Sequence, residues 1–96
     1  MTQERPKRIP IDDATLDKVM SMFREQLSEA FEKHGRGACW SMHEANSMMG
    51  EERDEAEDEV RANNIDGFLR ESIDVMVAGF WSAASVVAGG IVKEWD

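Results

Sequence analysis

Apolar residues recur at helical spacing in three separate stretches of this 96-residue chain. The first stripe comprises Leu16, Val19, Met20, Phe23, Leu27, Ala30 and Phe31. Asp12 or Asp13 is suited to cap a helix that begins near Ala14, and the glycines of Gly35-Arg36-Gly37 are suited to end it. The pattern therefore predicts a helix from about residue 14 to His34.

A second helix is predicted to begin at Ser41-Met42-His43-Glu44, because Ser41 and Glu44 have the spacing of a capping box. It runs to about Ala62, with a thin apolar face and an acidic remainder. Asp66 is a candidate N-cap for a third helix, which is apolar almost all round and ends at Gly89-Gly90.

No alternating run bounded by hairpin turns is present, so the fold class is all-α. We expect a helical bundle of three main helices and a short fourth one within residues 91–95. Residues 1–11 contain two prolines and form a flexible arm, whereas residues 12–96 form one helical domain. A third helix apolar on most sides indicates a subunit interface, so oligomerisation would complete a four-helix-type core.

The charge balance narrows the classes of partner. Twenty acidic and eleven basic residues give a net charge of −9, which argues against a nucleic acid or an anionic membrane as partner. The longest apolar stretch, residues 75–92, is interrupted by serines and glycines and is short for a membrane span. The lone Cys39 cannot form an internal disulfide, and no apolar run follows the basic N-terminus, so we expect a cytoplasmic protein.

Two pairs of carboxylates carry the candidate chemistry. Glu52 and Glu55 are three residues apart, as are Glu71 and Asp74, so each pair shares one face of its helix. The second pair is the more informative, because carboxylates on so apolar a helix are costly to bury without a cation. Oxygen ligands suit Mg²⁺, whereas the sequence offers no His or Cys cluster for zinc and no Asp/Gly-rich loop for Ca²⁺.

These motifs resemble the MazG-like, all-α nucleoside triphosphate pyrophosphohydrolase superfamily over about residues 16–87. The resemblance is carried by the Trp-Ser-x-His-Glu entry at residues 40–44, the acidic motif at residues 51–55 and the Glu-x-x-Asp motif at residues 71–74. It implies Mg²⁺-dependent hydrolysis of a nucleoside triphosphate to the monophosphate and pyrophosphate, with Mn²⁺ as a substitute metal. It also implies a homodimer or homotetramer of helical subunits.

By this resemblance the metal ligands are Glu52, Glu55, Glu71 and Asp74. Glu51 would bind a second ion or orient the attacking water, so Glu51 and Glu52 are the catalytic candidates. The implied mechanism is attack of an activated water on the α-phosphorus, with pyrophosphate leaving.

The remaining substrate-binding candidates are Trp40, His43, Arg70 and Lys93. Trp40 would either stack on a nucleobase or staple its loop onto the core. His43 is a hydrogen-bonding candidate, although exposed polar residues are common in a first helical turn. Arg70 and Lys93 are candidates for the phosphate tail, with surface pairing to acidic neighbours as the alternative.

Two other functions fit the same sequence. Phosphoribosyl-ATP pyrophosphohydrolases are similar at the motif level. Alternatively, the chain is a non-catalytic acidic adaptor whose apolar third helix binds a partner protein. An enzyme of this kind should be stabilised by millimolar Mg²⁺, and an adaptor should not.

Overall fold

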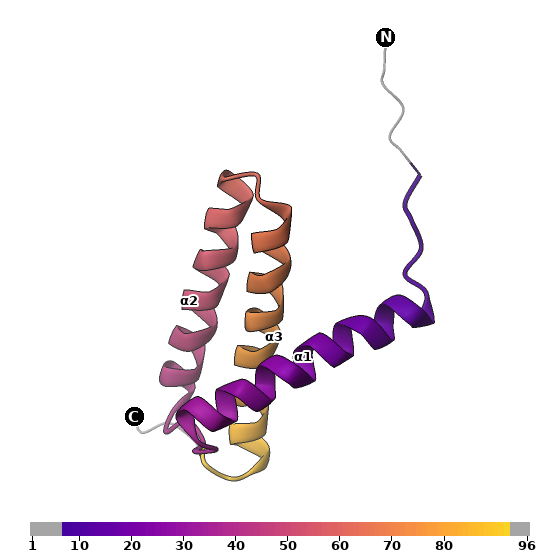
Figure 1. The fold of residues 1–96 in the computed structure, drawn as a ribbon. Helices are drawn as coiled ribbons and strands as arrows, with labels where there is room; N and C mark the ends of the chain where they lie inside the picture. Colours follow the sequence, from indigo (N-terminus) through magenta and orange to yellow (C-terminus); the bar gives the residue numbers. More distant parts are fainter. Residues whose placement is uncertain (1–6, 93–96) are drawn as a thin grey trace.

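A hairpin of two antiparallel helices forms the body of the molecule (Figure 1). The computed structural model describes residues 7–92, and it places the helices α2 at Met42–Arg61 and α3 at Ile65–Val87. A three-residue turn joins them, in which Asn63 adopts a left-handed conformation with φ of 54°. Small residues allow the helices to approach: Ala45 on α2 and Gly67, Ala78 and Ser85 on α3 are all buried.

The first turn of α3 is capped by Asn64 rather than by the predicted Asp66. The Asn64 Oδ1 atom accepts a hydrogen bond of 3.1 Å from the Gly67 amide. Because Asn63 already turns the chain, the helix begins at Ile65, one residue before Asp66. Asp66 therefore lies inside the first turn, where its negative charge favours the helix dipole but its side chain is past the capping position.

The helix α1, at Asp13–His34, crosses α3 at a steep angle and extends beyond the hairpin (Figure 1). Its ends follow the sequence prediction: the Asp12 carboxylate accepts from the Thr15 amide at 2.8 Å, and Gly35 ends the helix with φ of 78°. Contact with α3 is made from the middle of α1 onward. The ring of Phe23 lies 5.9 Å from that of Phe80, and the ring of Phe31 lies 5.2 Å from that of Trp81.

The loop between α1 and α2 is fastened to the last turns of α3. Buried Ser85 accepts a hydrogen bond of 2.9 Å from the Cys39 amide and donates one of 2.7 Å to the Trp81 carbonyl. The indole Nε1 of Trp81 donates to the Gly37 carbonyl at 2.8 Å. Trp81 therefore holds this loop against α3. Trp40 does not, since its side chain is 87% exposed.

The prediction of an all-α fold with three main helices is confirmed, and the described part of the chain contains no strand. After α3 the chain turns through residues 88–90 and buries Ile91 beside Cys39 and Ala45. The predicted fourth helix falls largely on residues 93–95, which lie outside the described residues. None of the three helices is long and apolar enough to cross a membrane.

Candidate metal centre

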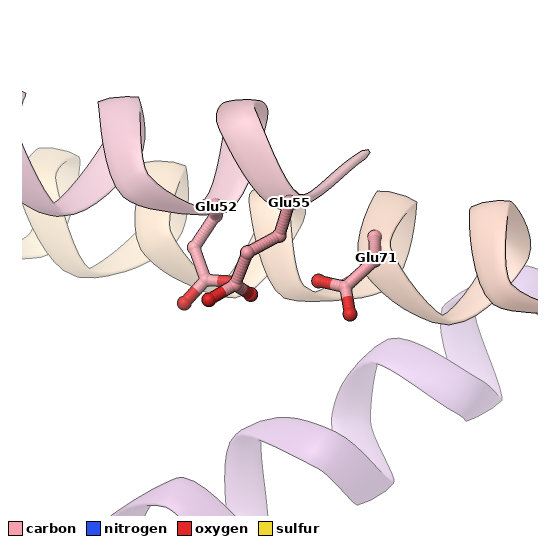
Figure 2. A group of neighbouring side chains, drawn as sticks. All are labelled: Glu52, Glu55 and Glu71. Atoms are coloured by element: carbon pink, nitrogen blue, oxygen red, sulfur yellow. The ribbon is translucent and has the colours of Figure 1, made fainter. Parts of the chain in front are cut away.

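The hairpin brings the two predicted carboxylate pairs to one place. Its short turn sets the last third of α2 against the first half of α3, so that Glu55 comes opposite Glu71. One carboxylate oxygen from each of Glu52, Glu55 and Glu71 lies within 4.8 Å of the other two. Figure 2 shows these side chains reaching from both helices to the side of the hairpin along which α1 runs. We call these three residues, with neighbouring Asp74, the acidic cluster.

The carboxylates of Glu52, Glu71 and Asp74 are held where their charge is unfavourable. Burial raises the pKa of Glu52 to about 7, and the charges of Glu55 and Asp74 act in the same direction. Burial, followed by interactions with Glu55, also raises the pKa of Glu71. The pKa of Asp74 is raised first by burial and then by the charge of Glu55. Repulsion of this kind favours a bound cation or proton.

Among residues 7–92 no basic side chain forms an ion pair with the acidic cluster. The ion pairs of this region join Arg61 to Glu57 and Asp58, in the last turns of α2. The Oε2 atoms of Glu52 and Glu71 are buried and have no hydrogen-bond partner. Unsatisfied buried oxygens are costly, so these two atoms are natural positions for a ligand bond.

The geometry of the cluster suits a hard divalent cation. Oxygens on opposite sides of a bound Mg²⁺ or Ca²⁺ stand about 4–5 Å apart, because each metal–oxygen bond is about 2.0–2.6 Å. The oxygens of Glu52, Glu55 and Glu71 meet this limit. Glu55 is exposed, which leaves room for water and phosphate oxygens on the same ion. The residues present therefore fit a Mg²⁺ or Mn²⁺ ion.

A groove of about 570 Å³ runs from this cluster between α1 and the hairpin. Glu51, Glu52 and Asp74 line its acidic end. Met48, Val77, Ala78 and Trp81 form an apolar wall, and the α1 side contributes Gln26, Glu29, Ala30, Lys33 and His34. A second hollow of about 360 Å³ lies on the other side of Asp74 and includes Arg70, Glu71 and Glu29. Together these hollows give the carboxylates access to solvent and to a ligand.

The fold places some of the other predicted site residues near the acidic cluster and others away from it. Glu51 and Arg70 lie beside the acidic cluster, one in each hollow. Trp40 lines neither hollow and is almost fully exposed, so the structure does not bring it to the carboxylates. His43 lines a separate hollow with residues such as Met42 and Asn46. Lys93 lies outside the described residues.

Sequence reasoning missed the contribution of α1 to the groove. Gln26, Ala30, Lys33 and His34 recur at steps of three and four, which marks one side of a helix. That periodicity was available in the sequence. Which side of α1 faces the carboxylates depends on which side of this helix packs on α3, where Phe23 and Phe31 contact Phe80.

Comparison of the chain with models of known protein families, with curated proteins and with solved structures finds no match.

Proposed function

We propose that the protein is a Mg²⁺-dependent nucleoside triphosphate pyrophosphohydrolase. The observation that carries the proposal is the acidic cluster, in which carboxylates from two helices converge with buried, unpartnered oxygens at the end of an open groove. The resemblance of the two acidic motifs to the MazG-like superfamily points to the same activity.

Glu52, Glu55, Glu71 and Asp74 would hold the ion. A bound Mg²⁺ supplies positive charge to the phosphate oxygens and makes water a better nucleophile. Glu51 is exposed at the rim of the groove, one residue from Glu52, where its carboxylate can orient a water and accept its proton. Attack at the α-phosphorus would release pyrophosphate and leave the nucleoside monophosphate.

The groove offers a place for the rest of the substrate. Its volume of about 570 Å³ lies within the usual range for small-molecule sites. The apolar wall of Met48, Ala78 and Trp81 suits the flat face of a nucleobase. Lys33 and His34 add basic groups at the end of α1, suited to polar or anionic parts of the ligand. We therefore propose that the base lies against Trp81 and the phosphates lie at the acidic cluster.

The experiment is release of pyrophosphate from a panel of natural and modified nucleoside triphosphates in the presence of Mg²⁺. We expect turnover by the wild type and loss of turnover in Glu52→Gln and Asp74→Asn. Asp54→Asn is the matched control, since Asp54 lies on the same helix as Glu52 but on its opposite side. No release from any triphosphate by the folded wild type, or equal activity in Glu52→Gln, would refute the proposal.

Lys33→Ala tests the groove separately from the chemistry. If Lys33 contacts the substrate, removing its charge should raise KM about 10–150-fold, the loss of one charged hydrogen bond, with a smaller effect on kcat. Lys18→Ala is the control, because Lys18 lies on the same helix but outside both hollows. An unchanged KM in Lys33→Ala would exclude this contact.

A further inference from the structure

The two hollows beside the acidic cluster meet at Gln26, Glu29 and Asp74, which line both of them. Gln26 and Glu29 are three residues apart on α1, so they share one side of that helix. We call these two residues the α1 pair. Figure 2 shows the carboxylates of Glu52, Glu55 and Glu71 reaching toward the side of the hairpin along which α1 runs. The α1 pair is therefore the part of α1 that lines the meeting point of the hollows.

The residues of α1 and α3 follow the same order along this path. From Asp74 the larger hollow extends to Trp81, and the smaller one extends to Arg70. Trp81 is seven residues from Asp74 on α3, which is about 10 Å along the helix axis. On α1, Lys33 lines only the larger hollow and Glu25 lines only the smaller one. The α1 pair thus lies in the middle, between the apolar wall at Trp81 and the hollow that contains Arg70.

Within residues 7–92, neither side chain of the α1 pair makes a hydrogen bond or an ion pair. Half-buried Gln26 offers an amide donor and a carbonyl acceptor, and exposed Glu29 offers two carboxylate oxygens. A ribose carries neighbouring 2′- and 3′-hydroxyls, and a hydroxyl both donates and accepts hydrogen bonds. An acidic side chain is also the group that binds the ribose 2′-hydroxyl in dinucleotide-binding folds. The α1 pair therefore has the chemistry that recognises a ribose.

We propose, on the basis of the function proposed above, that Glu29 and Gln26 bind the sugar and select ribonucleoside over 2′-deoxyribonucleoside triphosphates. Under that function the base lies against Trp81 and the phosphates lie at the acidic cluster. The sugar joins these two parts in every nucleotide, so it lies beside the α1 pair. Glu29 accepts hydrogen bonds from the 2′- and 3′-hydroxyls, and the Gln26 amide donates to a hydroxyl oxygen. A deoxyribose leaves one carboxylate oxygen of Glu29 without its donor.

Binding of paired nucleotides tests this selection without turnover. The probes are the α,β-methylene analogues of ATP, GTP, CTP and UTP and of their 2′-deoxy counterparts, each titrated with Mg²⁺ by isothermal calorimetry. For the base that binds most tightly, the wild type should bind the ribonucleotide about 10–150-fold more tightly, the effect of one hydrogen bond to a charged group. Glu29→Ala should bring the two affinities close to equality, and Gln26→Ala should weaken binding of both nucleotides.

Glu32→Ala and Glu25→Ala are the matched controls. Each removes a carboxylate from α1, but Glu32 lines neither hollow and Glu25 lines only the smaller one. Both variants should therefore keep the wild-type ratio of affinities. Because Glu29 is exposed on a helix, Glu29→Ala should fold, and its helical circular dichroism checks this.

Equal affinity of the wild type for the two sugars, tighter binding of the deoxyribonucleotide, or an unchanged ratio in Glu29→Ala would overturn the sugar assignment alone. Hydrolysis is measured separately with the cleavable triphosphates. A protein that binds the analogues with the expected preference, but releases no pyrophosphate, would confirm the sugar assignment and refute the proposed activity. Failure of the folded wild type to bind any analogue would overturn both.

Discussion

Replacing Glu52 by glutamine should stabilise the metal-free protein and remove its response to Mg²⁺. The side chain keeps nearly the same shape, but it loses the charge that is repelled by Glu55 and Asp74 and opposed by burial. When the site is empty, the charge of Glu52 lowers the stability of the folded protein. When Mg²⁺ is bound, the same charge stabilises the complex. The same substitution should therefore have opposite effects in the two conditions.

The raised pKa of Glu52 sets the size of the first effect. Its rise from an ordinary 4.5 to about 7 would correspond to roughly 3 kcal/mol for a group shielded from water. Solvent reaches this partly exposed cluster, so we expect about 1–2 kcal/mol. For a domain of this length such a change raises the melting temperature by on the order of 5–10 °C.

The sign of the pH dependence follows from the same pKa. Between pH 4.5 and about 7 the folded protein holds a proton on Glu52 that the unfolded chain releases. The stability of the metal-free wild type should therefore fall as the pH rises through this window and level off above it. Glu52→Gln should flatten this part of the profile, and Asp54→Asn should leave it unchanged.

Differential scanning fluorimetry at pH 8, with and without Mg²⁺, measures both effects. At ten times its dissociation constant, Mg²⁺ should stabilise the wild type by about 1.4 kcal/mol. Glu52→Gln should begin at a higher melting temperature and gain little from the metal. If Glu52→Gln melts lower than the wild type without metal, or gains equally from Mg²⁺, the electrostatic account of the cluster is wrong.

Two further predictions concern the loop fastened to α3. Ser85→Ala should destabilise the fold by about 1–3 kcal/mol in urea unfolding, because it leaves the buried Cys39 amide without its hydrogen-bond acceptor. Ser82→Ala, which removes a bond within α3 alone, should change the free energy of unfolding by less than about 0.5 kcal/mol. Gly90→Ala should cost about 1–3 kcal/mol, since its new Cβ would meet the Cβ of Ala38. Gly50→Ala is its control, because a Cβ there meets open space inside a helix and should stabilise by about 0.5–1 kcal/mol. Equal effects within either pair would contradict this description of the loop.

Local signals in the sequence predicted the helices well. Asp12 and Ser41 are caps as expected, and Gly35 ends α1 where the pattern placed its end. The predicted N-cap of α3, Asp66, was wrong because Asn64 and Asp66 are both good capping residues. The choice between them depends on where the turn between α2 and α3 closes, and the left-handed Asn63 settles that point.

The carboxylate pairs were predictable for a similar reason. Spacing of three residues fixes which side chains share a helix face, and a short connection makes two helices antiparallel neighbours. The roles of Trp40 and Trp81 were not predictable in this way. Either indole could have closed the loop, and only the packing of α1, the loop and α3 places Trp81 inside and leaves Trp40 in solvent.

The most direct test of the proposed activity is ³¹P NMR of a turned-over nucleoside triphosphate in ¹⁸O-labelled water with Mg²⁺. Attack of water on the α-phosphorus should give the nucleoside monophosphate and pyrophosphate, with the label in the monophosphate. Label in the pyrophosphate, products of diphosphate and inorganic phosphate, or no turnover by the folded protein would contradict the proposal.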